Sequence, residues 1–456
     1  MEKRERFASR LGFILISAGC SIGLGDVWRF PYITGQYGGG IFVLIYLIFI
    51  FALGLPIITM ELAVGRASQK SIATSFKVMQ REGQKWHWTG YAGIAGNYLL
   101  MMFYTTIAGW MLAYFYRFLI GQFDGLNAEQ IGQVFDNLIA NPVEMTIWLV
   151  ITTVFCFGVC SVGLQEGVEK ITKVMMVLLL ALIVVLAVKS MTLPNAEEGL
   201  KFYLLPDFNR MQENGIWETI FAAMSQAFFT LSIGIGSLAI FGSYIGKERS
   251  LLGESINIAS LDTVISIIAG LIIFPATFSF GVDPGQGPGL VFVTLPNIFN
   301  SMSAGRIWGT LFFIFMTFAA YSTVIAVFEN IISFGMDLWG WSRKKASIIN
   351  TILIIVLSMP CVLGFNVLSG FNPLGAGTNI LDLEDFIISY NLLPLGSLAY
   401  LLFCVTRYGW GFDKYMEEVN TGEGMKLSPA FKGYFQWILP IIILVVLIQG
   451  YVNFFS

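Results

Sequence analysis

Two short runs of glycines and hydroxyl-bearing residues carry most of the chemistry that this sequence offers. Residues 21–25 read SIGLG and residues 232–236 read SIGIG, so one pattern recurs 211 residues later in a second apolar stretch. Two glycines within three residues weaken a helix by about 1 kcal/mol each. Unwound backbone inside a membrane is tolerated where its polar groups line a buried site. Free N–H groups at such a break suit a carboxylate, and free carbonyls suit a cation.

The same glycines could instead allow close packing between helices, as in GxxxG contacts. Matched breaks in the two halves of a chain favour the other interpretation, an inverted-repeat transporter with its site near mid-membrane. The two runs lie five predicted helices apart, and an odd number inverts the second half relative to the first. We therefore predict that helices 1 and 6 are unwound at these two runs.

Other kinds of chemistry find little support in the residue types. His87 is the only histidine, and the five cysteines lie in apolar stretches without the spacing of a zinc site or a disulfide framework. No nucleophile–base pair or metal cluster can be recognised, which argues against an enzyme. The net charge of −3 gives no reason to expect a nucleic-acid partner.

The elements that must position these runs are long apolar helices. Hydrophobic residues make up 56% of the 456 residues and charged residues only 12%, which indicates an all-α membrane protein in a lipid bilayer. A spanning helix needs about 20 apolar residues. Eleven stretches qualify: roughly 11–33, 40–64, 89–120, 145–162, 168–190, 216–245, 255–280, 307–337, 347–364, 386–406 and 434–454.

The positive charges predict the orientation and the division of the chain. With the N-terminus in the cytoplasm, 20 of the 26 lysines and arginines lie on that side, as the positive-inside rule requires. An odd number of helices then places the C-terminus outside. The predicted parts are a cytoplasmic tail 1–10, a first repeat 11–190, an extracellular loop 191–215, a second repeat 216–406, a cytoplasmic loop 407–433, and an eleventh helix with the extracellular C-terminus 434–456.

Four motifs resemble a known family. Residues 23–32 (GLGDVWRFPY), 38–40 (GGG), 228–232 (FFTLS) and 289–296 (GLVFVTLP) are similar to stretches of the neurotransmitter:sodium symporter family, in its prokaryotic amino-acid branch. The resemblance runs nearly end to end. It implies a LeuT-like inverted repeat of five plus five helices with one extra helix. It also implies a prokaryotic cell-membrane symporter, in which Na⁺ entry drives amino-acid uptake by alternating access.

The resemblance implies two sodium sites. Residues matching the first are Ser21, Asp26, Thr230 and Asp262. Those matching the second are the carbonyls of Gly19, Ile22 and Ala319 with the hydroxyls of Ser322 and Thr323. Taken alone, adjacent serine and threonine in an apolar helix more often bond to carbonyls of their own helix. Five oxygens also suit a hard cation.

The implied substrate site lies beside these ions. The substrate carboxylate would bind the N–H groups of Leu24 and Gly25 and the hydroxyl of Tyr104. Its amine would meet carbonyls of Ser21, Phe229 and Thr230, with the Ser232 hydroxyl nearby. The substrate side chain would face Leu100, Met101, Phe229, Ile235, Thr323 and Val327, which are almost all apolar, so an apolar amino acid is expected. Gly23 replaces the Asp of amine-transporting relatives, which also favours an amino acid.

Two gates are implied by the same resemblance. Arg29 and Asp385 look like the outer pair, above Tyr104 and Phe229, although Arg29 could also be a snorkelling residue. Arg4 and Asp337, with Phe7 and Tyr244, look like the inner closure. Without the family match, Arg4 would be an ordinary positive-inside residue.

Two other acids lie within predicted helices. Glu61 is expected to be functional or part of a polar network, as intramembrane acids usually are. Glu329 is a weaker candidate and could simply cap polar backbone.

The sequence departs from the family pattern at three positions. Asp26 and Asp262 stand where Asn is usual, and Val177 stands where helix 5 often has Pro. Two carboxylates about 5 Å apart repel by roughly 3 kcal/mol at an effective dielectric near 20. The pair is therefore expected to share a proton in the empty site. The alternatives are that water keeps both ionised, or that Asp26 turns away to bond a backbone N–H near the break.

Chloride is not expected to be required. Tyr46, Gln226, Thr230 and Ser266 match the donors that surround chloride in dependent relatives, but Asp262 would supply the negative charge permanently. A less specific role for Asp262 is hydrogen bonding to neighbouring hydroxyls. The main alternative function is a substrate-sensing receptor that keeps the fold without turnover; the intact gate pairs and ion ligands favour transport.

Overall fold

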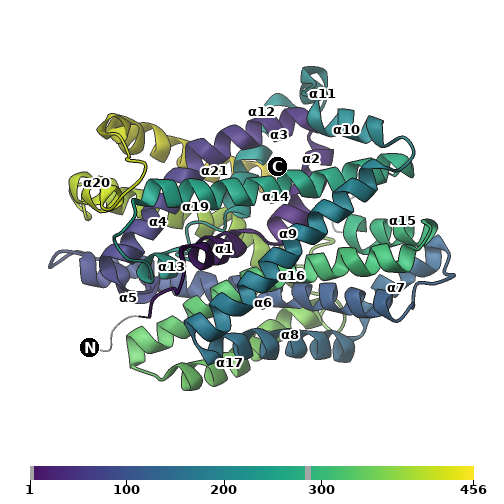
Figure 1. The fold of residues 1–456 in the computed structure, drawn as a ribbon, viewed down its shortest axis with the longest axis horizontal. Helices are drawn as coiled ribbons and strands as arrows, with labels where there is room; N and C mark the ends of the chain where they lie inside the picture. The colour runs from purple at the N-terminus through teal and green to yellow at the C-terminus, as the bar shows by residue number, and fades with distance from the viewer. Residues whose placement is uncertain (1–4, 283–288, 456) are drawn as a thin grey trace.

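The computed structural model describes residues 5–282 and 289–455, and those residues form an elongated bundle of helices (Figure 1). Apart from one isolated bridge between Arg249 and Glu423, the described ranges contain no β-structure. Short helices gather at both ends of the long axis (Figure 1). One end holds α5 (Ile72–Met79), α13 (Ala239–Ser243) and α20 (Phe412–Asn420), and the other holds α7 (Ala128–Ala140), α10 (Ala196–Leu204) and α15 (Leu295–Ser301).

Apolar helical spans make up the described part of the bundle. Nine helices of the described chain are long and apolar enough to cross a membrane, and a bent pair, Arg10–Ser21 with Gly25–Gln36, makes a tenth. The interrupted helices α12 and α13 form the remaining span. This arrangement agrees with the predicted count, although most boundaries move by a few residues.

The elements of the spans are, in chain order, α1 (Arg10–Ser21) with α2 (Phe30–Gln36), α3 (Gly40–Phe49) with α4 (Leu55–Ser68), α6 (His87–Leu119), α8 (Pro142–Val162), α9 (Lys170–Met191), α12 (Ile216–Thr230) with α13 (Ala239–Ser243), α14 (Leu251–Ser279), α16 (Gly305–Trp339), α17 (Arg343–Gly364), α18 (Ile380–Ile387) with α19 (Leu393–Val405), and α21 (Leu439–Phe455). The short connecting helices are α5 (Ile72–Met79), α7 (Ala128–Ala140), α10 (Ala196–Leu204), α11 (Phe208–Glu213), α15 (Leu295–Ser301) and α20 (Phe412–Asn420).

Helices 1 and 6 are broken at the two glycine runs, as predicted. The two parts of helix 1 meet at an angle of 54° on either side of residues 22–24. Helix 6 loses its helical backbone over residues 231–238, between α12 and α13. Within this stretch Ser232 has a φ of 50°, a conformation that is uncommon for a residue other than glycine. At both breaks, backbone N–H and C=O groups in the middle of the span have no partner within their own helix.

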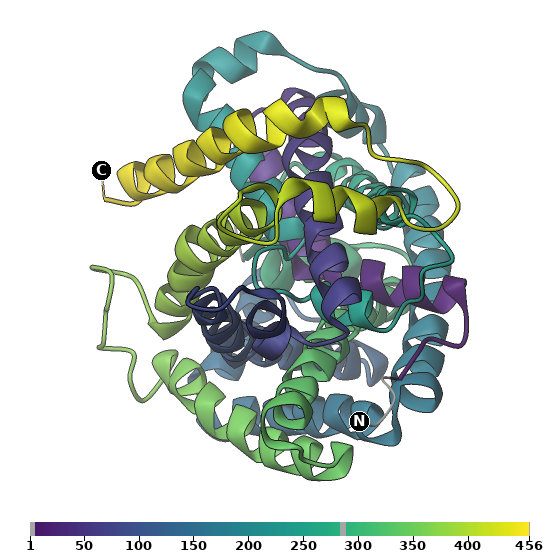
Figure 2. The same ribbon diagram turned by 90° about the vertical axis from the view of Figure 1, so that its left-hand side faces the viewer.

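The bundle has a protein-enclosed centre and an apolar rim. The hydrophobic part of α16 is 83% buried and that of α6 is 72% buried, whereas the last span is only 28% buried. Figure 2 shows the yellow helix α21 along the outside of the molecule. Exposed residues on the rim are apolar, as lipid contact requires: they include Val177, Val184 and Val188 on α9 and Ile441, Leu444 and Ile448 on α21.

Helix 5 is regular at the position where a proline is often found in the family. Val177 lies inside α9, which continues without interruption from Lys170 to Met191. The irregular part of this span is the π-helical turn Leu164–Glu169, which precedes α9 and begins after Gly163. Gly163 has a φ of 127°, a conformation that L side chains rarely adopt, so the irregularity lies at the start of the span.

Candidate substrate and ion site

The two helix breaks face each other in the buried centre. The Ser21 hydroxyl donates to the carbonyl of Leu231, at 3.3 Å. The Gln226 amide donates to the carbonyl of Gly25, at 2.9 Å. A Cβ on Gly25 would lie 3.1 Å from the ring of Phe229, so the two helices approach closely at this point. The structure thus joins the two SIGxG runs in one place.

A small cavity lies at this junction. Its volume is about 20 Å³, and it is lined by Ser21, Gly23, Gly25, Leu100, Tyr104, Phe229, Thr230, Ser232, Ile388 and Leu393. Seven of these residues were predicted to contact the substrate. Ile388 and Leu393 belong to the tenth span and were missed, because nothing in their apolar stretch distinguishes a pocket residue from a packing residue. Leu24 lines the neighbouring outer cavity instead.

Four other predicted residues are buried but are not among those that line the small cavity: Met101, Ile235, Thr323 and Val327. Thr323 lies close to it, since its hydroxyl is near the position that a Cβ on Gly23 would occupy. The Tyr104 hydroxyl would also clash with that Cβ. Position 23 therefore has no room for a side chain in this arrangement, in agreement with the absence of an Asp there.

The groups predicted to hold a carboxylate lie together. The N–H of Leu24 donates to the hydroxyl of Tyr104, with nitrogen and oxygen 2.9 Å apart. Tyr104 comes from α6 and Leu24 from the break in helix 1, and both side chains are buried. A backbone N–H and a hydroxyl side by side can both donate to an anionic oxygen, once that oxygen replaces the Tyr104 hydroxyl as the acceptor of the N–H.

Five oxygens converge where the second sodium site was predicted. The Thr323 hydroxyl lies 3.2 Å from the carbonyl of Gly19 and 3.1 Å from that of Ile22. The Ser322 hydroxyl lies 2.9 Å from the carbonyl of Ala319 and 3.4 Å from that of Ile22. The hydroxyls therefore reach across to helix 1 and do not bond only to carbonyls of α16. An uncharged set of carbonyl and hydroxyl oxygens fits Na⁺, which is a hard cation.

The two acids predicted for the first sodium site differ in their surroundings. Asp26 accepts the N–H of Gly23 at 3.0 Å and the Ser266 hydroxyl at 2.5 Å. Asp26 thus bonds backbone at the break, which is one of the alternatives considered for it. Asp262 is fully buried, and within the described ranges neither of its carboxylate oxygens has a hydrogen-bond partner. A buried carboxylate without partners is costly, so this group fits a cation or a proton.

Glu61 belongs to the network that supports the broken helix 6. Its carboxylate accepts the N–H groups of Gly234 at 2.6 Å, Gly236 at 3.3 Å and Leu238 at 3.1 Å. Three donors of the unwound segment are therefore satisfied by one acid on α4. This result agrees with the network role expected for an intramembrane acid.

The residues of the predicted outer gate line one cavity above the pocket. This cavity measures about 140 Å³, and its walls include Arg29, Asp385, Tyr104 and Phe229. The Arg29 guanidinium lies over the ring of Phe229, with Cζ 4.2 Å from the ring centroid. Asp385 accepts the hydroxyl of Ser389 at 2.7 Å. The structure therefore brings the outer pair to the same space, directly over the residues that cover the pocket.

Two of the residues predicted for the inner closure, Phe7 and Tyr244, are in contact. Phe7 packs edge-on against Tyr244, with ring centroids 5.9 Å apart, and its N–H donates to the Tyr244 carbonyl. Asp337 accepts the N–H and the hydroxyl of Ser71, at 2.8 and 2.7 Å. Arg4 lies outside the described residues.

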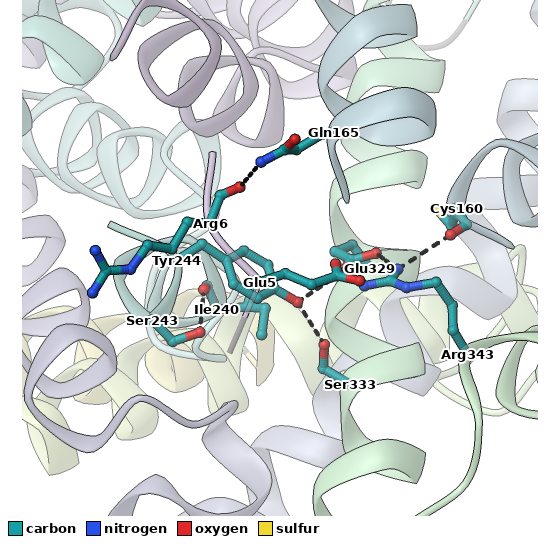
Figure 3. Close-up of polar contacts among 10 residues, drawn as sticks. All are labelled: Glu5, Arg6, Cys160, Gln165, Ile240, Ser243, Tyr244, Glu329, Ser333 and Arg343. Carbon is teal, nitrogen blue, oxygen red and sulfur yellow. Dashed lines mark hydrogen bonds and ion pairs between the residues drawn. The ribbon is translucent and has the colours of Figure 1, made fainter. Parts of the chain in front are cut away.

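A second inner network centres on Arg343 and Glu329 (Figure 3). Their closest nitrogen and oxygen are 2.6 Å apart, and Glu329 is fully buried. The Tyr244 hydroxyl donates to the same carboxylate at 2.6 Å, and Arg343 also pairs with Glu5 of the tail at 2.6 Å. Sequence reasoning counted Arg343 only as a positive charge and gave Glu329 a minor role. No spacing along the chain indicates this pair, because it depends on how α17 packs against α16.

Long apolar spans in the described residues, two facing helix breaks at mid-bundle, and residues predicted as gates on both sides of a small pocket are the features of a secondary transporter built on an inverted repeat. The chain belongs to the sodium:neurotransmitter symporter family, whose model matches residues 4–124 and 126–456. It is a sodium-dependent, multi-pass membrane transporter and not an enzyme. The family and the fold predicted from the sequence are confirmed.

Named relatives cover almost the whole chain. An uncharacterized sodium-dependent transporter of Bacillus subtilis (strain 168) is 32% identical over 450 residues, which are 98% of each chain. The sodium-dependent serotonin transporter of Drosophila melanogaster is 26% identical over 98% of this chain and 76% of its own. The crystal structure of MhsT in complex with L-phenylalanine has a TM-score of 0.88 at 39% identity, covering 98% of this chain and 100% of that one.

Proposed function

We propose that this transporter imports an apolar L-amino acid together with Na⁺ by alternating access. The observation that carries the proposal is the convergence of the Ser322 and Thr323 hydroxyls on the carbonyls of helix 1. Beside it lies a pocket with an N–H and a hydroxyl that can donate to the carboxylate of a substrate. The pocket walls contributed by Leu100, Ile388 and Leu393 are apolar. MhsT, which is similar over its whole length, was crystallised with L-phenylalanine.

In this mechanism the chain supplies binding groups and movable barriers. The Leu24 N–H and the Tyr104 hydroxyl hold the substrate carboxylate, and carbonyls at the two breaks face its amine. Na⁺ at the Ser322–Thr323 cluster ties helix 1 to α16 and so favours the arrangement in which the pocket is formed. Opening of the Arg29–Asp385 side alternates with opening of the Arg343–Glu329 side, so substrate and Na⁺ cross together.

A first sodium site is proposed at Asp26 and Asp262, with Ser21 and Thr230. Asp262 has no other partner among the described residues, and its negative charge would balance a cation there. The same charge makes chloride unnecessary. Ser266, which corresponds to a chloride donor in relatives, already donates to Asp26. The Tyr46 hydroxyl lies 3.4 Å from that of Ser266, so a second donor of the set lies beside the same acid.

We also propose that the N-terminus is cytoplasmic and the C-terminus extracellular, in the cell membrane of a prokaryote. The charge count of the loops supports this orientation. A reporter fused after Ser456 that is active only in the cytoplasm is expected to be silent, while the same reporter placed after Arg343 should be active. Strong signal from the C-terminal fusion would contradict the orientation.

Two measurements test the function. A binding screen of the twenty amino acids on the purified protein, with and without Na⁺, is expected to select apolar ones and only with Na⁺. Counterflow of the labelled amino acid in proteoliposomes then separates transport from sensing. A receptor that binds without turnover would show Na⁺-dependent binding but no counterflow.

A further inference from the structure

The unwound segment of helix 6 is held from two sides by different chemical groups. Its N–H groups bond to the carboxylate of Glu61 on α4. Its carbonyls at Ile235 and Gly236 bond instead to the side-chain amides of Asn97 and Asn330. Irregular backbone at membrane depth needs such partners, because lipid offers no hydrogen-bonding groups in their place. Each side of the segment is thus fixed by its own set of residues.

Asn97 connects this segment to α6. Its amide nitrogen donates to the Ile235 carbonyl at 2.8 Å and to the Gly93 carbonyl of its own helix at 2.7 Å. Its side-chain oxygen accepts the amide of Asn330 at 2.9 Å. Both polar atoms of the side chain are therefore in use, and the side chain is fully buried.

Asn330 completes the pair from α16. The same amide nitrogen that donates to Asn97 also reaches the Gly236 carbonyl, at 3.3 Å. Asn330 is likewise buried, and its own side-chain oxygen has no partner within the described ranges. The two asparagines therefore link α6 and α16 to consecutive carbonyls of one non-helical stretch.

The residue held by this pair stands next to the substrate pocket. A Cβ on Gly96 would lie 2.9 Å from Cγ2 of Ile235, so Ile235 is wedged against α6. Gly96 lies one turn before Leu100, which lines the pocket, and Ser232 of the same unwound segment lines it as well. The cavity of about 20 Å³ has room for only about one water molecule. Space for a larger side chain must therefore come from movement of a wall.

We propose that Asn97 and Asn330 are positioning residues that determine the size of the amino-acid side chain this transporter accepts. By fixing the Ile235 and Gly236 carbonyls, they hold the irregular wall of the pocket close to α6. Apart from Gly23 in the break of helix 1, the other lining residues lie in helices or helical turns, whose position does not depend on single amide bonds. This inference rests on the proposed amino-acid substrate.

The test compares how tightly each variant binds a small and a large apolar amino acid. Asn330→Leu and Asn97→Leu keep the approximate volume but remove the amide. The unwound segment then loses the hydrogen bond that holds its carbonyl in place. We therefore expect the affinity for phenylalanine relative to alanine to rise about fivefold. This change corresponds to one net hydrogen bond of about 1 kcal/mol. The dependence of binding on Na⁺ concentration should stay as in the wild type.

A matched control is available in Asn350→Leu. Asn350 is also buried; it accepts the Tyr98 hydroxyl and donates to the Ala346 carbonyl of its own helix, away from the unwound segment. The Asn350→Leu variant should leave the ratio of phenylalanine affinity to alanine affinity unchanged, even if it lowers thermal stability. The double variant of Asn97 and Asn330 should shift the ratio by less than the sum of the two free-energy changes, because the side chains act through one shared bond.

Ile235→Ala provides an independent measurement if the asparagine variants fold poorly. It leaves both amides in place but shortens the side chain that separates the unwound segment from α6 beside the pocket, so the same rise in the ratio is expected. An unchanged ratio in Ile235→Ala, or in a folded Asn330→Leu, would overturn the inference. If the wild type binds alanine and phenylalanine with Na⁺ but the variants leave the phenylalanine-to-alanine ratio unchanged, this inference fails and the proposed function stands. Wild-type protein that binds no amino acid would refute the proposed function first.

Discussion

The backbone N–H of Leu24 donates to the hydroxyl of Tyr104 across 2.9 Å, although the two residues lie 80 positions apart in the sequence. This bond joins the broken part of helix 1 to α6 at the edge of the pocket. The Tyr104 hydroxyl therefore lies beside the N–H groups at the break of helix 1, where a substrate carboxylate could bind both.

Replacement of Tyr104 by Phe is therefore expected to weaken amino-acid binding about tenfold to a hundredfold, because a hydrogen bond to a charged group is worth about 1.5–3 kcal/mol. Isothermal titration with Na⁺ present measures the effect. Tyr321→Phe is the matched control, since that hydroxyl contacts Thr152 away from the pocket. Equal affinities for wild type and Tyr104→Phe would remove Tyr104 from the site.

Replacement of Thr323 by Val keeps the shape of the side chain but removes one oxygen from the cluster shared with Gly19 and Ile22. We expect Na⁺-dependent uptake to be lost while the protein stays folded in detergent. Thr317→Val is the control on the same helix, because the Thr317 hydroxyl bonds to the Phe313 carbonyl of α16 itself. Wild-type uptake with an unchanged Na⁺ dependence in Thr323→Val would rule out this ion site.

Chloride should have little effect on the wild type, because we propose that Asp262 supplies the negative charge that balances Na⁺ when the ion is bound. Uptake is expected to be nearly the same when gluconate replaces chloride. In Asp262→Asn the charge is absent, and chloride should then stimulate whatever uptake remains. A collapse of wild-type uptake in gluconate would refute the charge-substitution argument.

The pair of Arg343 and Glu329 should hold the inner side closed. Arg343→Gln leaves Glu329 buried without its cation, and breaking a buried pair in this way costs about 3–5 kcal/mol. The inner side should then open more often, and maleimide should label the buried Cys160, whose carbonyl Arg343 contacts, faster than in the wild type. Peptide mass spectrometry identifies the labelled cysteine.

Glu329→Gln added to Arg343→Gln removes the unpaired charge, so labelling of Cys160 should return towards the wild-type rate. Equal labelling in the single variant and the wild type would show that this pair does not control access from the inner side.

Sequence reasoning was strongest where a local pattern carries its own physical meaning. Apolar length predicted the spans, and paired glycines predicted both helix breaks, because each depends on residues close together in the chain. The seven predicted residues around the pocket came from the family resemblance. Ile388 and Leu393 were missed because they are ordinary apolar residues whose role depends on how the tenth span packs.

Charged residues that pair across the fold were also missed. Arg66 was counted as a positive charge on the cytoplasmic side, but its side chain is fully buried and pairs with Glu418, 352 positions away. The bonds of Asn97 and Asn330 to helix 6 likewise cross between spans. No spacing along the chain indicates such contacts, since they depend on tertiary packing alone.

The central claim is that a Na⁺ gradient drives amino-acid entry through this protein. Proteoliposomes loaded without Na⁺ and diluted into Na⁺ with labelled leucine or phenylalanine test it most directly. The account predicts accumulation above the outside concentration, which collapses when Na⁺ is equal on both sides and is absent in Thr323→Val. Accumulation of the same size without a Na⁺ gradient, or none for any apolar amino acid that binds, would contradict it.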